Sequence, residues 1–381
     1  MAQEVFRPVG KNSGKDQTGR VITARGLWLP AMLILMADPA LGKKTNLPIY
    51  QEPFDIAAGG ASLTRASQDG VMYANPALMP WGNKFHRWMG SQMGLYYTKA
   101  SQETIQGLAG GGNDAASLDA ETLLDSEVSG GFFTSTSWIT SHFGIGMFGS
   151  GGIDLEGSEH GSATGAPVIK FGAEAYGGGA VALAIKAPKI LSLGLNLKYV
   201  TISEPALDIP LIDQEAIADL QSNPDVIQSQ LQLGTGAGFD VGTLFFLQGS
   251  WIDYRLAFKV DDVGNTKLSG GDTAELKQTM HVGTALTFHG NTEALHLALD
   301  YRDISGAYEE KMFKKVYAGV RLLLRNYWGF ALGIYHGNPT FGAKLDFVFF
   351  RVGMTYFKKE LTDVIGERPR ATYMYYFALG F

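Results

Sequence analysis

The chain has 381 residues, a formal net charge of −6 and no cysteine, and only 18% of its residues are Asp, Glu, Lys or Arg. That charged fraction lies below the roughly 25% of an ordinary soluble domain, and an acidic chain without a basic stripe is not expected to bind nucleic acid. A mean hydropathy of +0.01 without an apolar run of about 20 residues argues against membrane-spanning helices, and an aromatic content of 12% argues against disorder. The lack of cysteine excludes a disulfide framework and a thiolate metal site.

A single apolar run, residues 27–36, lies near the beginning of the chain. Arg20 and Arg25 precede it, and small residues follow it up to Gly42. This is the layout of a secretory signal peptide, and the run is too short to anchor the chain in a bilayer. We expect residues 1–42 to be a signal peptide. A buried helix of a soluble domain is the alternative, and the long stretch before the run leaves the translation start open.

From about residue 84 onward, apolar residues recur at every second position. In a strand, this alternation places one set of side chains on each face. The segments run about 10–13 residues, as tilted strands in a bilayer require, whereas globular strands average about 5–6. The expected strands are 84–98, 128–139, 142–155, 176–187, 190–202, 233–248, 251–263, 274–289, 293–304, 313–325, 327–337, 339–348, 350–359 and 371–381.

The connections between these strands alternate in length. Most of those after odd-numbered strands are long, and those after even-numbered strands have mostly two or three residues. Short periplasmic turns and longer outer loops produce this rhythm in transmembrane β-barrels. The fold class is therefore all-β, a transmembrane antiparallel β-barrel of about 14 strands, in the region 81–381. The eleventh connection, near Asn338, is short and leaves the strand count open by two.

Two of the long connections have distinctive compositions. Residues 101–127 are rich in Gly and Ala, whereas 203–232 carry apolar residues at helical spacing. Amphipathic helices in an outer loop must cover apolar surface. We expect helical outer loops near both ranges, which form either a cap on the barrel rim or a vestibule that captures a hydrophobic solute.

The last predicted strand ends in an apolar row at the end of the sequence. Alternation makes this row a lipid-facing strand face, and its terminal aromatic residue resembles the signal read by the barrel-assembly machinery. The row consists of Tyr373, Tyr375, Phe377, Leu379 and Phe381.

Charged residues occupy the polar positions of several neighbouring strands. A charge on the lipid face would cost about 2–4 kcal/mol at the midplane, so these side chains are expected to face the lumen. They are Arg255, Lys259, Asp300, Arg302, Arg321, Lys344, Asp346 and Arg351. Most would pair with one another or with residues inside the barrel, and a minority would meet a carboxylate head group passing through.

The segment before the first strand carries two short motifs, Gly59-Gly60-Ala61 and Asn75-Pro76-Ala77. At this spacing they resemble the N-terminal segment of the outer-membrane long-chain fatty acid transporter (FadL-type) superfamily. That superfamily includes the type IX secretion shuttle and conjugal-transfer barrels. Weaker sequence similarities to the same superfamily occur in residues 234–242, 262–266 and 299–303, so the resemblance covers roughly residues 54–381.

The resemblance implies a fourteen-stranded barrel whose N-terminal segment folds into the lumen as a hatch. We assign residues 43–80 to this hatch, because glycine and proline interrupt them and no long alternating row occurs. A barrel of this width also leaves a lumen that its own side chains do not fill. A free periplasmic tail is the alternative.

The implied function is uptake of hydrophobic or amphipathic small molecules, such as fatty acids, across the outer membrane of the cell. A scaffold or shuttle barrel for secreted or conjugation-related surface proteins is the alternative. A transporter of this type needs a lateral opening into the bilayer, for which Gly177, Gly178 and Gly179 are the best candidates. The implied partners are outer-membrane lipid, the barrel-assembly machinery and a hydrophobic ligand, with a secreted protein in the alternative.

Motifs for enzymatic chemistry do not stand out. The seven histidines show no HExxH spacing, and no Walker loop or Gly-x-Ser-x-Gly elbow occurs. His281 and His289 are expected to be inward-facing polar residues of one strand rather than metal ligands. We therefore expect no catalytic residues, no metal, no cofactor and no enzymatic activity.

Overall fold

The structure is a computed structural model, and its described part comprises residues 50–67, 70–81, 87–99, 101, 127–158, 168–187, 190–203, 206–210, 234–269, 275–308, 310–325, 327–347, 349–360, 365–366 and 369–380. Contacts divide the chain into Met1–Met36 and Ala37–Phe381, and every described residue belongs to the second unit. The expected signal peptide, the first residues of the expected hatch and Phe381 lie outside the described residues.

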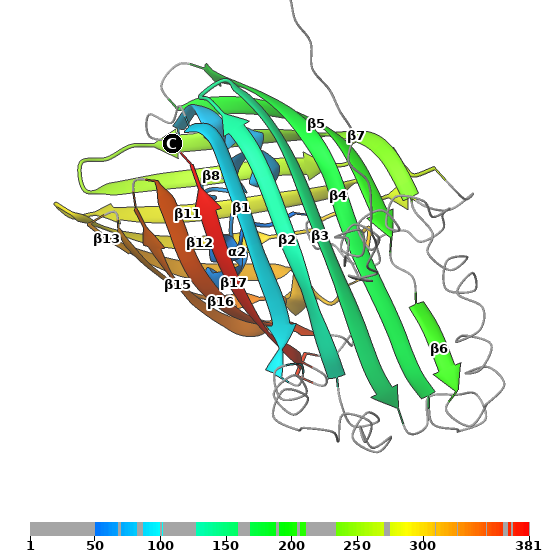
Figure 1. The fold of residues 1–381 in the computed structure, drawn as a ribbon. Helices are drawn as coiled ribbons and strands as arrows, with labels where there is room; N and C mark the ends of the chain where they lie inside the picture. The colour runs from blue at the N-terminus through cyan, green and yellow to red at the C-terminus, as the bar shows by residue number, and fades with distance from the viewer. Residues whose placement is uncertain are drawn as a thin grey trace, which may run out of the picture. The chain divides into compact units, whose positions relative to one another are not determined.

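Within the described residues, 14 antiparallel strands form a closed barrel (Figure 1). The ring closes where the first strand pairs with the last, Ser91 lying opposite Leu379. This confirms the predicted fold class and resolves the strand count. The strands are β1 (Arg87–Thr98), β2 (Glu127–Ile139), β3 (Phe143–Ser158), β4 (Val168–Ala187), β5 (Leu191–Ser203), β7 (Gly234–Leu247), β8 (Ile252–Asp261), β11 (Thr279–His289), β12 (Glu293–Tyr301), β13 (Val316–Leu324), β14 (Trp328–Tyr335), β15 (Asn338–Asp346), β16 (Phe350–Glu360) and β17 (Pro369–Leu379).

The two faces of the barrel differ as the alternation predicts. In β8, Tyr254, Leu256 and Phe258 are exposed. Asp253, Arg255 and Lys259 occupy the alternate positions of the same strand and are buried. Apolar side chains exposed on other strands include Met93, Leu95, Ile145, Met147, Leu183, Ile185, Leu193, Leu197, Leu297, Leu299, Leu332, Ile334, Tyr375, Phe377 and Leu379. Such an outer surface matches the hydrocarbon of a bilayer, whereas the inward positions carry the polar side chains.

The two ends of the barrel also differ. Connections of a few residues, such as 140–142 and 290–292, lie at one end, which we call the short-turn end. At the opposite end, the long-connection end, the described residues include one tight turn, between β14 and β15. Its two residues, His336 and Gly337, have φ of 50° and 81°. Positive φ at both central positions is typical of the type I′ turn that favours tight hairpins, which explains the short eleventh connection.

Two short strands, β6 (Ala206–Pro210) and β9 (Thr266–Lys267), were not predicted, and the predicted strand 274–289 is divided into a third short strand, β10 (Glu275–Leu276), and β11. β6 pairs with residues 168–172 of β4, so the start of the connection expected to be helical is a strand. The remaining residues of that connection that were expected to be helical, 211–232, lie outside the described residues, as do 102–126. β9 and β10 form a separate two-stranded sheet.

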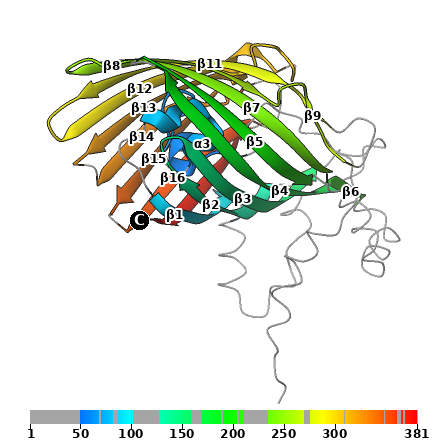
Figure 2. The same ribbon diagram turned by 90° about the horizontal axis from the view of Figure 1, so that it is seen from above.

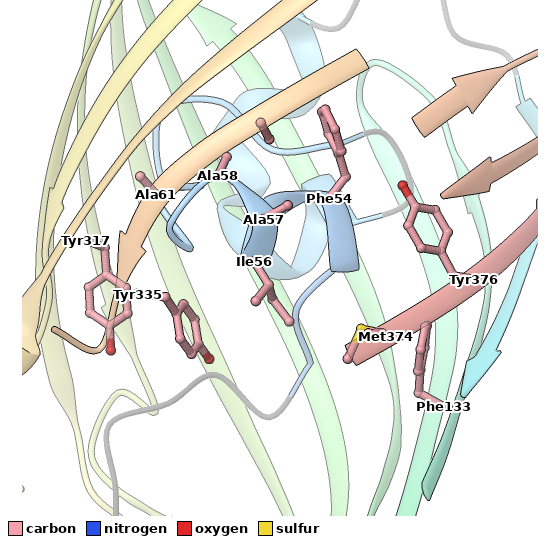
Figure 3. Packing of buried hydrophobic residues seen from close by; sticks show 11 residues of the cluster. Phe54, Ile56, Ala57, Ala58, Ala61, Phe133, Tyr317, Tyr335, Met374 and Tyr376 are labelled. Carbon is pink, nitrogen blue, oxygen red and sulfur yellow. The ribbon is translucent and has the colours of Figure 1, made fainter. Parts of the chain in front are cut away.

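Residues 50–81 contain the short helices α2 (Pro53–Ala57), α3 (Val71–Ala74) and η3 (Pro76–Trp81), and η4 (Met312–Lys315) precedes β13. Glu52 caps α2 by accepting a hydrogen bond from Asp55 N. Figure 2 draws α3 within the ring of strands. In Figure 3, Phe54 and Ile56 of α2 lie among Tyr335, Met374 and other inward side chains of the wall. No helix among the described residues is long and apolar enough to cross a membrane.

Candidate functional site

The backbone at Gly59 and Gly60 lies directly against the barrel wall. Both residues have positive φ, 68° and 71°. A Cβ on Gly59 would collide with the backbone of Ala318 and Ile334, and one on Gly333 would collide with Gly59. Only glycine fits both the conformation and the contact, because the two backbones touch without side chains between them. Ala61, the third residue of this motif, is fully buried.

Three charged side chains of the barrel wall bind the backbone of residues 60–63, and we call this set of contacts the clamp. The Asp300 carboxylate accepts hydrogen bonds from Ser62 N at 2.7 Å and Leu63 N at 2.9 Å. Arg302 donates to Gly60 O at 2.7 Å, and Arg321 donates to Ala61 O at 3.0 Å. The clamp therefore pairs backbone donors with an acid and backbone carbonyls with arginines.

The Asn75-Pro76-Ala77 motif contacts β5 and β7. Asn75 is fully buried and donates to Leu63 O at 3.0 Å and Thr243 O at 3.3 Å, while its Oδ1 accepts from Ala77 N at 3.1 Å. Ala77 O accepts from the hydroxyl of Ser192 at 2.5 Å. Pro76 lies against Gly194, where a Cβ would collide with it.

The other charges that we expected in the lumen also contact residues 50–81 or one another. Arg255 donates to Thr64 O at 3.3 Å, and Lys259 donates to Tyr73 O at 2.7 Å. Lys344 Nζ lies 4.6 Å from the centre of the Phe54 ring and 3.5 Å from Asp346. Arg351 pairs with Asp346 at 2.9 Å.

A small pocket opens between residues 50–81 and the wall, toward the long-connection end. One side of it is aromatic. Tyr50 and Tyr73 have ring centres 4.8 Å apart, and Phe148 lies 5.6 Å and 5.4 Å from them. This aromatic triad packs on a buried apolar cluster of Val200, Ile202, Leu268 and Leu276. Such a wall can accept an apolar group.

The other side of the pocket is charged. Lys198 Nζ lies 2.6 Å from Asp240 and 3.0 Å from Asp262. Lys259 lies 2.6 Å from Asp261, whose second oxygen is 3.1 Å from His281 Nε2. Burial raises the pKa of Asp262, although the neighbouring Lys198 opposes this effect. The pocket therefore offers an apolar wall and a hydrogen-bonding wall to one ligand.

The ring of Tyr73 belongs to the aromatic wall, and its hydroxyl lies beside Gly146 of β3. Burial raises the pKa of this phenol, so it keeps its proton. Among the described residues the hydroxyl has no hydrogen-bond partner. The cavity here measures only ≈ 60 Å³, below the ~300–1,000 Å³ of typical ligand pockets. Residues 50–81 would have to move before a larger solute could enter.

Sequence reasoning identified Lys259 and His281 as inward residues but missed most of this pocket. One signal was available, since Asn196, Lys198 and Asp240 occupy the polar positions of adjacent strands. Asn196 lies opposite Asp240 in the β5–β7 register. The aromatic triad could not be derived from alternation, because Tyr50 and Tyr73 come from residues outside the barrel strands.

The structure closes the wall where we expected a lateral opening. Both ladders of β4 run unbroken through Gly177, Gly178 and Gly179, to β3 on one side and β5 on the other. The Phe148 ring occupies the space beside Gly178. The absence of side chains thus accommodates a neighbouring aromatic residue of the wall, and the lateral opening predicted here is not present in the structure.

The final strand presents its aromatic row outward. Tyr375, Phe377 and Leu379 are exposed, and Tyr375 stacks on Tyr97 of β1 at 6.0 Å. Tyr373 lies 5.1 Å from Tyr356 of β16. The row therefore spans the seam at which the barrel closes. Elsewhere in the described residues, no group of three or more His, Asp or Glu side chains could hold a metal ion.

No model of a protein family and no curated protein sequence matches the chain. Solved structures do match. A deletion mutant (deltaS2S3) of the monoaromatic hydrocarbon channel TodX is 11% identical, with a TM-score of 0.53 over 87% of this chain and 98% of that one. The deltaS2 mutant of TodX is 11% identical, with a TM-score of 0.52 over 88% and 99%. The toluene transporter TbuX of Ralstonia pickettii is 12% identical, with a TM-score of 0.47 over 88% and 98%.

At these identities the likeness shows a shared fold. The barrel architecture that the FadL-type resemblance implied is therefore confirmed.

Proposed function

We propose that the chain is an outer-membrane channel for uptake of hydrophobic or amphipathic small molecules, in which residues 43–80 act as a hatch. The observation that carries this proposal is the pocket formed by the aromatic triad Tyr50, Tyr73 and Phe148 beside the polar group around Lys198. Its apolar wall suits a hydrocarbon group, and its polar wall suits a head group or hydroxyl. The similarity to structures named as monoaromatic hydrocarbon channels supports the same class of solute.

The contacts of residues 50–81 support the hatch. They meet β5 and β7 through Asn75 and Ser192, and β12 and β13 through the clamp of Asp300, Arg302 and Arg321. A solute held against Tyr73 would lie on the long-connection side of this segment. Movement of the segment would then connect the pocket with the rest of the lumen. The step needs no catalytic residue, so the proposed activity is passive and non-enzymatic.

Solute extraction from the purified barrel tests this proposal directly. The full chain, isolated from outer membranes in a mild detergent, would be extracted with organic solvent and the extract analysed by mass spectrometry. We expect an acyl or aromatic compound in the wild-type extract and less of it in Phe148→Ala. Phe330→Ala is the matched control, because it removes an exposed phenyl ring of the lipid-facing surface. Equal recovery from both variants would count against the pocket.

Uptake by cells provides the second measurement. Cells that express the wild-type barrel should accumulate a labelled long-chain acid or toluene faster than cells without it. Phe148→Ala should lower this rate more than Phe330→Ala does at equal barrel abundance. A scaffold or shuttle barrel for secreted proteins, the alternative class, predicts no solute uptake and a co-purifying protein.

A further inference from the structure

Three arginines converge at the short-turn end of the lumen, away from the pocket described above. Arg65 belongs to residues 50–81, Arg255 to β8 and Arg321 to β13. The charges of all three act on the imidazole of His296 in β12, which is buried. His296 lies opposite Arg321 on one side and Thr287 on the other. The strand registers and residues 64–65 thus bring three cations to one buried imidazole.

The carboxylates near this cluster are already engaged. Asp55 pairs with Arg321 at 3.0 Å and accepts hydrogen bonds from the backbone and hydroxyl of Ser67. Asp253 accepts from Gly249 N at 3.2 Å and lies 2.7 Å from His289 Nε2. The buried carboxylate of Asp300 also acts on Arg321, but it pairs with Arg302 at 3.9 Å. Four cations therefore share three acids, and one positive charge remains uncompensated in a largely buried place.

Several hydrogen-bonding groups of the cluster are also unused. Among the described residues, Arg65 makes no ion pair or hydrogen bond, and neither Arg255 Nε nor the hydroxyl of Thr64 has a partner. His296 Nδ1 lies 2.9 Å from the Thr287 hydroxyl, whereas its Nε2 is unpaired. The tautomer with a proton on Nε2 adds one more donor. Buried polar groups are rarely left unsatisfied, so this set of donors calls for an acceptor.

The guanidinium of Arg65 remains charged at neutral pH. Burial, followed by the positive charges of Arg255 and Arg321, lowers the pKa of Arg65 to about 9. Deprotonation is therefore not the way in which this cluster relieves its repulsion. A bound anion would relieve it and satisfy the unused donors at once.

We propose that Arg65, Arg255, Thr64 and His296 form a binding site for an oxyanion, a carboxylate or phosphate group, at the short-turn end of the lumen. Arginine presents planar N–H donors that suit both groups, and such charge-assisted bonds are stronger than neutral ones. The anion joins a side chain of residues 64–65 to side chains of β8 and β12. It consequently fastens this segment to the wall from the periplasmic side, independently of the solute in the aromatic pocket.

Trifluoroacetate is a suitable probe, because its ¹⁹F resonance broadens on binding to the full barrel in detergent. We expect saturable broadening that inorganic phosphate or decanoate displaces. Arg65→Gln and Arg255→Gln should each weaken binding by about tenfold, as expected for loss of one charge-assisted hydrogen bond. Displacement at lower concentration by phosphate would identify a free phosphate-type anion, and displacement at lower concentration by decanoate would identify the head group of an amphiphile.

Arg370→Gln is the matched control, because Arg370 pairs with Asp154 at 2.9 Å at the long-connection end. Its binding should equal that of the wild type. If Arg255→Gln fails to assemble, Arg65→Gln carries the test, since Arg65 does not belong to a strand. Absence of saturable broadening in the wild type, or equal loss in Arg65→Gln and Arg370→Gln, would overturn the site.

Discussion

The side-chain amide of Asn75 occupies the space that a side chain at Gly242 would need. A Cβ built on Gly242 would collide with Asn75 Oδ1. The same amide donates to Leu63 O and to Thr243 O. The lack of a side chain at Gly242 of the wall therefore leaves room for the buried amide of Asn75. Through this amide, Leu63 and Asn75 are both linked to β7.

Replacing Asn75 with Ala should loosen this contact without opening the barrel. The variant leaves backbone carbonyls of Leu63 and Thr243 without their donor, at a cost of about 1–3 kcal/mol. The strand ladder does not depend on the amide, because its hydrogen bonds are closed between strands. We expect a higher single-channel conductance in planar bilayers for Asn75→Ala.

Asn338→Ala provides the control for this measurement. It also removes a buried asparagine amide, but that amide donates to His336 O within the β14–β15 hairpin. Its conductance should match that of the wild type. Equal conductance in all three proteins would argue that the Asn75 contact does not hold a gate.

The clamp around residues 60–63 predicts a change in mobility. The N–H groups of Ser62 and Leu63 both donate to one carboxylate oxygen of Asp300, Oδ2. Asp300→Asn removes the negative charge of this acceptor, so both bonds change from charge-assisted to neutral and weaken. Because the chain contains no cysteine, Ala66→Cys supplies a unique site for a nitroxide label. Electron paramagnetic resonance should report a more mobile label in Asp300→Asn.

The control replaces another inward carboxylate. Asp346 pairs with Arg351 of β16 and Lys344 of β15. The label should keep its wild-type spectrum in Asp346→Asn. A spectrum that changes equally in both variants would mean that general loosening of the wall, rather than the clamp, controls the segment.

The acidic loop after β12 predicts a pH dependence. Asp303 accepts from Lys315 Nζ at 3.0 Å and from the backbone N–H groups of Ala307 and Tyr308 at 2.9 and 3.2 Å. Burial alone would raise the pKa of Asp303, but these donors outweigh it and hold the pKa below its ordinary value.

A depressed native pKa adds stability above the unfolded value of about 3.9, and this contribution is lost as the pH falls toward the native value. The loop should therefore keep its conformation from neutral pH down to about pH 4 and loosen below it. The amide resonances of Ala307 and Tyr308 can follow this change. Asp303→Asn should remove the transition, and a transition near neutral pH would exclude Asp303 as its origin.

The strands were predictable because the bilayer imposes alternation along most of each strand. All 14 barrel strands fall within or near their predicted ranges. The largest error is the beginning of β4, at Val168 rather than 176. Its first residues pair with β6, which was not predicted either. β6 itself was missed because it occupies five residues of a long connection.

The contacts inside the barrel were less predictable. Alternation identified Asp300 and Arg302 as inward residues, but it carries no information about which backbone atoms they would meet. Likewise, glycines in β4 suggested an opening, and only the three-dimensional packing shows that Phe148 fills the space beside Gly178. Long-range contacts between residues 50–81 and the wall depend on two surfaces at once, which a local pattern cannot describe.

The closing seam predicts an effect of Phe381 on assembly. Tyr375 stacks on Tyr97 across the seam, and Phe381 continues the same alternating row in the sequence. Deleting Phe381 should reduce the yield of heat-modifiable barrel far more than deleting the exposed Ser305 does. Wild-type yields after deletion of Phe381 would contradict a role of this aromatic residue in barrel assembly.

Removing the whole proposed hatch gives the strongest test of the gate. The wall ladder is complete without residues 43–80, so a chain that lacks them should still assemble as a barrel. The deletion leaves Asp300, Arg302 and Arg321 without their contacts to residues 60–63, and water can solvate these charges in an open lumen. We expect a conductance above that of Asn75→Ala and the loss of selective uptake of hydrophobic solutes. A deletion barrel with wild-type conductance would show that the segment does not close the lumen, and the gating part of the proposed function would fail.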